Sequence, residues 1–148
     1  MRPIAIGYLV TALASVGMLL FAWRWPRPAR LVYAALFLVA GIFNIWTALR
    51  TPHVYVEGFA PLAFPPMREF IERVVSLAPD VFVITVAIGQ VIVAIALALG
   101  GAVLLWFGVV GGAFFMVAIS WLGVGAAFPT NLVLAIGVLL LLRARRTC

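Results

Sequence analysis

The sequence predicts an all-α, polytopic helical transmembrane bundle of five spans with an outer interfacial amphipathic helix. Hydrophobic residues make up 67% of the 148 positions and charged residues only 9%, whereas a soluble domain is usually about 45–50% apolar and about 25% charged. The apolar residues also gather into stretches close to the roughly 20 residues that a helix needs to cross a bilayer. These few charged side chains cannot cover a water-soluble domain of this size. We therefore expect the chain to lie in the lipid bilayer.

The first two predicted spans cover residues 4–23 and 31–49, and neither contains a charge. A cleaved signal peptide is the alternative for the first span, because Arg2 precedes it and Ala12-Leu13-Ala14 resembles a cleavage site. The apolar run continues for several residues beyond that point, which favours a retained membrane helix.

A polar stretch over residues 50–80 separates the second and third spans and forms the outer loop. Within it, the pattern predicts an amphipathic helix over residues 66–77, because apolar residues recur at Met67, Phe70, Ile71, Val74 and Val75. Pro66 suits its first turn, Pro79 ends it, and Asp80 is expected to cap the third span. This helix is either a lid over a lipid-accessible pocket or a connector that holds a long loop in the interface, and the connector is favoured.

The last three predicted spans cover residues 81–99, 102–122 and 126–142, with a tight turn at Gly100-Gly101 between the first two of them. The final span is interrupted by Pro129 and is unbroken only from residue 132, which is short for a bilayer. A four-span protein is therefore the alternative to five spans.

The distribution of arginine predicts the orientation. With five spans, one side of the membrane carries six arginines and no acid, and the other carries four arginines and all four acids. Because basic residues accumulate on the cytoplasmic side, the N-terminus is expected outside and the C-terminus in the cytoplasm. All ten basic residues are arginine, which together with the abundant Ala, Gly and Pro is typical of a GC-rich bacterial coding sequence, so we expect the bacterial inner (plasma) membrane.

The spans contain no charge near their centres, which weighs against a proton pump or an ion channel. Asn44 and Gln90 are the most informative polar residues within spans, because a carboxamide in hydrocarbon needs a hydrogen-bond partner; the partner is either the other amide or a ligand. Near the outer surface, Arg50, His53 and Glu57 are candidates for a small polar site that faces a quinone headgroup or a periplasmic partner. An enzymatic function would require these three side chains to converge.

Two stripes of small residues are candidates for close helix packing: Gly7, Thr11 and Ser15 in the first span, and Gly108 with Gly112 in the fourth. They are expected to pack within the chain or against another subunit.

A single histidine and a single cysteine, Cys148, exclude an internal disulfide, bis-histidine haem ligation and a histidine-cluster metal site. No metal site, catalytic set or nucleotide-binding motif is expected, and the absence of a basic face argues against nucleic acid.

Residues 31–142 resemble the DoxX-like family of small integral membrane proteins. The residues that carry the resemblance are Gly41 and Asn44 at the end of one span, followed by Gly89-Gln90 and Gly100 around the next. The resemblance implies an accessory or quinone-proximal role in a redox membrane assembly. Two departures are the additional N-terminal span and Gln90, where the family more often has an acid.

Taken together, these features predict a non-catalytic accessory or anchor subunit of a larger membrane assembly, with the lipid bilayer and other subunits or a second copy as partners. The alternative is a small carrier or binder of an apolar ligand such as a quinone or a lipid, with Asn44 and Gln90 as polar anchors.

Overall fold

A computed structural model describes residues 2–126 and 128–143 and confirms the all-α architecture. The elements are α1 (Arg2–Arg24), α2 (Pro26–Arg50), α3 (His53–Phe59), η1 (Ala60–Leu62), α4 (Pro65–Arg73), η2 (Val75–Leu77), α5 (Pro79–Leu99), α6 (Ala102–Ser120), η3 (Gly123–Ala126) and α7 (Thr130–Leu140). No strand occurs in the described ranges.

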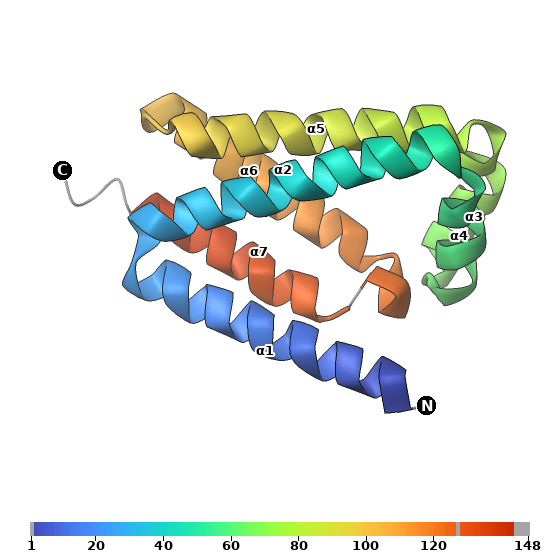
Figure 1. Cartoon of the computed structure of the whole chain (residues 1–148), viewed down its shortest axis with the longest axis horizontal. Coiled ribbons are helices and arrows are strands. Elements are labelled where there is room, and N and C mark those ends of the chain that lie inside the picture. Colours follow the sequence, from blue (N-terminus) through green and yellow to red (C-terminus); the bar gives the residue numbers. More distant parts are fainter. Residues whose placement is uncertain (1, 127, 144–148) are drawn as a thin grey trace.

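The five longest helices form a closed ring. Along the ring, α2 packs on α5, α5 on α6, α6 on α7, α7 on α1, and α1 returns to α2 (Figure 1). Large apolar side chains on α1, α2, α5 and α6 remain exposed on the outside of this ring, as expected when lipid rather than water surrounds the helices.

Four of these helices are long and apolar enough to cross a membrane: α1, α2, α5 and α6. The fifth apolar helix is shorter and covers Thr130–Arg143, so it is about 21 Å long at 1.5 Å per residue. It nevertheless runs the same way as a fifth crossing would. It starts beside the N-terminal half of α1 and ends beside the α1–α2 turn (Figure 1).

The two ends of the bundle differ in structure. One end, which we call the turn end, carries the α1–α2 turn and the Gly100-Gly101 turn, where both glycines have positive φ. The other, the cap end, carries residues 51–78, which we call the cap segment and which include α3 and α4 (Figure 1). Tryptophans lie half-exposed at both ends: Trp23, Trp25 and Trp106 at the turn end, and Trp46 and Trp121 at the cap end. This is the pattern of two aromatic belts at the membrane interfaces.

The cap segment differs from its prediction. The helix expected over residues 66–77 is α4, Pro65–Arg73, followed by the separate turn η2, and a second short helix, α3, precedes it. Asp80 was expected to cap the third span, but α5 already begins at Pro79, with Ala78 at the N-cap. Proline fits the first helical turn because it has no N–H to satisfy there. The same preference explains why α2 begins at Pro26 rather than at residue 31.

The turn end of the bundle is tightly packed. Ala22, Ala29, Leu97, Leu105 and Leu141 from all five helices are buried together there. Ala22 and Ala29 are small enough to let α1 and α2 approach closely, and the three leucines belong to the same buried cluster. The interior toward the cap end is packed less tightly and contains a cavity, which is the candidate site.

Candidate functional site

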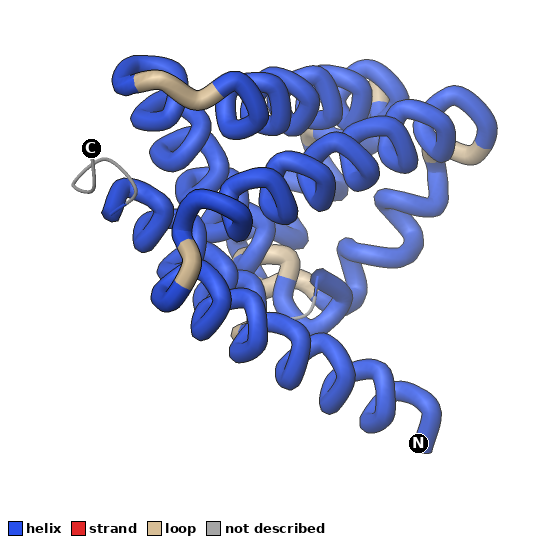
Figure 2. The backbone as a smooth tube through the Cα atoms, turned by 60° about the vertical axis from the view of Figure 1, so that its left-hand side comes forward, coloured by secondary structure: helices blue, strands red, loops and turns tan. Residues whose placement is uncertain are grey.

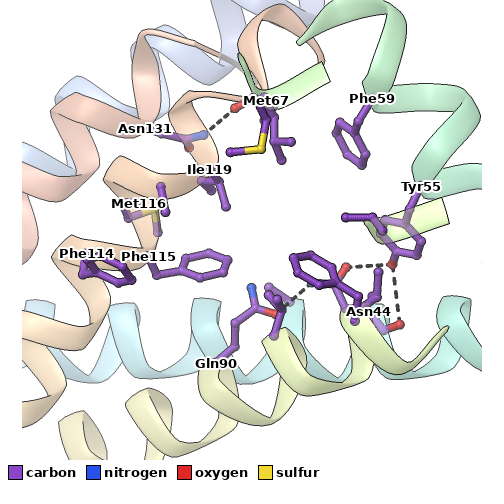
Figure 3. A pocket seen from close by; sticks show the side chains of 18 of the residues that line it. Asn44, Tyr55, Phe59, Met67, Gln90, Phe114, Phe115, Met116, Ile119 and Asn131 are labelled. Carbon is purple, nitrogen blue, oxygen red and sulfur yellow. Dashed lines mark hydrogen bonds between the residues drawn. The ribbon is translucent and has the colours of Figure 1, made fainter. Parts of the chain in front are cut away.

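A cavity of about 560 Å³ occupies the interior of the bundle next to the cap segment. Its walls come from α2, α5, α6, η3 and α7, and its roof from α3, α4 and η2 (Figure 3). Its volume lies within the range of about 300–1,000 Å³ that is typical of small-molecule sites. Apart from Asn44, Tyr55, Gln90 and Asn131, every side chain that lines it is hydrophobic.

The cavity exists because α5 and α6 diverge from their common turn. Near the turn they are in close contact: a Cβ on Gly108 would lie 2.9–3.0 Å from Leu97 atoms, and one on Gly111 3.1 Å from Val93. Beyond Gly111 the two helices separate toward the cap end (Figure 1). The residues that follow on α6, Phe114 and Phe115, therefore line the cavity; Phe115 packs edge to face on Phe37 of α2, with ring centroids 5.7 Å apart.

On the opposite wall, α2 and α5 stay close together along their length. A Cβ on Gly41 would lie 3.0 Å from Val91 Cγ2 and 3.1 Å from the Ala87 carbonyl oxygen. One turn further on, Asn44 Nδ2 donates a 2.8 Å hydrogen bond to Gln90 Oε1. The stretches around Gly41 and Gln90 therefore meet at this point in the structure.

Tyr55 of the cap segment completes a chain of three polar side chains. Its hydroxyl donates a 2.9 Å hydrogen bond to Asn44 Oδ1 (Figure 3). Partial burial raises the pKa of Tyr55, and the neighbouring Thr47 hydroxyl lowers it to a smaller extent. The phenol is therefore protonated at neutral pH and remains a donor.

A fourth polar residue, Asn131, lies on the far side of the cavity at the start of α7. Its Nδ2 donates to the Ala126 carbonyl oxygen (Figure 3). This bond ties η3 to α7 and keeps the amide at the cavity wall. Both amide-bearing walls are thus held by hydrogen bonds between separate elements.

The cap segment has its own small core. Ala60, Ala63, Ile71 and Val75 are buried against one another. Arg68 braces this fold from outside, since its Nε and Nη2 each donate a 2.9 Å hydrogen bond, to the carbonyl oxygens of Ala60 and Pro61. The predicted amphipathic pattern of α4 is therefore used to cover the cavity, because Met67, Phe70 and Ile71 all line it.

The cap segment is also attached to the end of α6. The Phe64 N–H donates a 3.3 Å hydrogen bond to the Trp121 carbonyl oxygen, and the Phe64 and Phe128 rings meet edge to face at 5.4 Å. Gly123 has φ +68 and touches the Leu62 carbonyl, so no side chain fits there. The roof is a folded element with defined attachments.

The rim of the cavity includes exposed aromatic side chains. Phe114 on α6 is 75% exposed, and Phe82 on α5 and Phe70 on α4 are also exposed. Phe70 and Phe82 pack edge to face with ring centroids 5.7 Å apart. The cavity thus opens sideways, between the diverging parts of α5 and α6, toward the surface that lipid would cover.

The structure does not unite the other predicted site residues. Arg50 places its guanidinium over the Trp46 ring at 4.7 Å. His53 and Glu57 are exposed on α3, and within the described ranges no hydrogen bond or ion pair joins them to each other or to Arg50. Nor do three His, Cys, Asp or Glu side chains of the described part come together in a way that could hold a metal ion.

The small-residue stripes have different surroundings. Gly108 and Gly112 are buried, and a Cβ on Gly112 would meet Phe37 and Val138 at 3.2–3.3 Å. In α1, Ser15 is buried, whereas Thr11 is exposed and nothing lies within 4 Å of a Cβ on Gly7. The stripe in α6 serves packing within the chain, and most of the stripe in α1 faces outward.

Sequence reasoning missed Tyr55 and Asn131 as site residues. Asn131 is adjacent to the Pro129 break, and Tyr55 lies in a stretch without a clear helical pattern. Neither stands in a sequence pattern that points to a cavity on the other side of the bundle. Comparison of the chain with models of known families, with curated proteins and with solved structures finds no match. The function is therefore inferred from the geometry of this site.

Proposed function

We propose that this small integral membrane protein binds an apolar molecule taken from the surrounding bilayer and holds it in the cavity beneath the cap segment. The observation that carries the proposal is the cavity itself: about 560 Å³ lined almost entirely by hydrophobic side chains. A cavity with so few polar groups does not hold water well. An apolar molecule would fill it and restore the packing contacts that the hollow part of the bundle lacks.

The roof supports the same proposal. A loop that only connected α2 to α5 would not need an internal core, a bracing arginine and a backbone bond to α6. These features keep the cap segment over the cavity. The lid interpretation of the amphipathic helix therefore accounts for more of the structure than the connector interpretation does.

The proposal is tested by filling the cavity from one wall. Ala118 on α6 lines the cavity, and Ala118→Trp would occupy much of the space that a ligand needs. Val110→Trp is the matched control, because Val110 lies on the same helix, is exposed and does not line the cavity. Native mass spectrometry of the purified full chain should show a retained lipid-like molecule in the wild type and the control, and loss of it in Ala118→Trp. Equal retention in all three would contradict the proposal.

A role as an accessory subunit is the second candidate, and the outward-facing stripe of α1 favours it. Nothing lies within 4 Å of a Cβ on Gly7, and Thr11 is exposed. Both belong to the N-terminal half of α1, which lies at the edge of the bundle (Figure 2). Such faces allow close approach of a helix from another subunit. Gly7→Leu should then release a co-purifying protein or lower the oligomeric state in mild detergent; an unchanged complex would argue against this face.

The DoxX-like resemblance adds a redox assembly as the proposed setting and a quinone as one proposed ligand.

We place the protein in the bacterial plasma membrane with the cap end outside, because the arginine-rich turn end suits the cytoplasmic side. The chain has one cysteine, Cys148, which serves as a natural reporter. A membrane-impermeant maleimide should label Cys148 only after the cells are permeabilised. In a Cys148→Ser background, Ser76→Cys in the cap segment should be labelled in intact cells. The reverse pattern would invert the topology.

A further inference from the structure

The amide of Gln90 has an unused hydrogen-bond donor that faces the cavity. Gln90 is only 3% exposed, and its Oε1 is occupied by Asn44 Nδ2. Within the described part of the chain its Nε2 has no hydrogen-bond partner, and Figure 3 shows this nitrogen on the cavity side of the amide. Buried amide donors nearly always have partners in folded proteins, so an unpaired donor beside a cavity points to a partner that occupies the cavity.

The neighbouring side chains fix the direction of this amide. Tyr55 donates to Asn44 Oδ1, and Asn44 Nδ2 donates to Gln90 Oε1. The three groups therefore form a directional chain in which each donor points to the amide oxygen of the next residue and the chain ends at Gln90. At its end, the Gln90 N–H groups remain available to an acceptor atom on a ligand.

The rest of the lining limits the charge of that ligand. None of the described side chains that line the cavity is ionised at neutral pH. A carboxylate or phosphate would lose its hydration there without gaining a cation, which is strongly unfavourable. A pure hydrocarbon would avoid that cost but would leave the Gln90 donor unpaired.

We infer that the ligand is an uncharged, lipid-like molecule with a hydrogen-bond-accepting oxygen, such as a ketone or ester carbonyl, that binds Gln90 Nε2 after entering sideways between α5 and α6. This inference rests on the proposed function, because it names the chemical class of the molecule in the cavity. The lateral route follows from the exposed rim at Phe82 and Phe114, which opens to the bilayer in which such a molecule is dissolved.

Three probes of equal heavy-atom number test the inference: 2-tridecanone, tetradecane and dodecanoate. Binding of each to the purified, delipidated full chain is measured by native mass spectrometry under one detergent condition. One additional buried hydrogen bond is worth about a fivefold difference in affinity. The ketone should therefore bind about fivefold more tightly than the alkane, and dodecanoate should bind most weakly.

Two variants connect the preference to the named atoms. Gln90→Met keeps the length of the side chain and a weak acceptor for Asn44 but removes the N–H donor, so the ketone and the alkane should become equal. Thr85→Val is the matched control on α5, because the Thr85 hydroxyl is exposed and bonds to the Val81 carbonyl of its own helix; it should keep the fivefold preference. Tyr55→Phe, which removes the first donor of the chain, should reduce the preference without abolishing alkane binding, and it provides a second test if Gln90→Met does not fold.

The outcomes separate the inference from the proposed function. Binding of no probe to the wild type would overturn both. Equal binding of ketone and alkane to the wild type, or a ketone preference that survives in Gln90→Met, would overturn the inference and leave the cavity as a site for plain hydrocarbon. Tighter binding of dodecanoate than of the ketone would also overturn it.

Discussion

The hydrogen bond between Asn44 and Gln90 should contribute a measurable coupling energy between α2 and α5. The bond is 2.8 Å long and Gln90 is buried, so water competes for it weakly. Interhelical hydrogen bonds in membrane proteins average about 0.6 kcal/mol and reach about 1.7 kcal/mol. A double-mutant cycle of Asn44→Leu and Gln90→Leu should therefore give a coupling energy of about 0.6–1.7 kcal/mol. Each single variant should be destabilised, because it leaves the other amide without this partner.

The assay is reversible unfolding of the purified chain in mixed micelles, followed by the fluorescence of its five tryptophans. A control cycle pairs Asn44→Leu with Thr85→Val, since Thr85 bonds only within its own helix. Residues without a shared partner usually show additive effects within about 0.3–0.5 kcal/mol. If the Asn44–Gln90 cycle is as additive as the control cycle, the hydrogen bond between the two amides contributes no measurable coupling energy. That result would refute the reasoning about the polar chain at the cavity wall.

Three further predictions concern the cap segment and the helix packing. Arg68→Ala should lower the stability of the cap segment against local opening by about 1–2 kcal/mol, because two carbonyl oxygens lose their donor. Hydrogen exchange should therefore rise across residues 51–78. Arg73→Ala, which removes only an exposed ion pair with Glu69, should leave the exchange unchanged. Gly108→Ala should destabilise the bundle by about 1–3 kcal/mol through overpacking, and Gly17→Ala, which meets open space, should be neutral or stabilising in the same unfolding assay. Because the pKa of Tyr55 is raised, the folded state holds the phenol proton more tightly than the unfolded state does. The contribution of this proton to stability should be complete below the ordinary pKa of about 10 and should fall as the pH rises above it. Melting temperatures between pH 8 and 11 should therefore fall more steeply for the wild type than for Tyr55→Phe.

Much of the fold follows from the sequence because the strongest constraints are local. A long apolar run can satisfy its backbone in lipid only as a helix, and this places α1, α2, α5 and α6. The Gly100-Gly101 turn follows from the freedom of glycine at positive φ. The same reasoning identified Asn44 and Gln90, because two carboxamides in hydrocarbon need partners.

The cavity depends on non-local geometry and does not follow from the sequence. Its volume depends on the angle at which α5 and α6 separate beyond Gly111, and that angle is set by packing among all five helices. Tyr55 joins the site only because the cap segment folds back over the bundle. Arg50, His53 and Glu57 are close in sequence, and yet the structure leaves His53 and Glu57 exposed on α3 and pairs Arg50 with Trp46. Nearness along the chain was a poor guide where the backbone turns between α2 and α3.

The most direct test of the proposed ligand site is a density map of the full chain in a lipid nanodisc. We predict continuous density for an elongated molecule in the cavity between α5, α6 and the cap segment, with one end within hydrogen-bonding distance of Gln90 Nε2. A cavity closed by the inward movement of Phe114 and Phe115, with no density inside, would contradict the central claim.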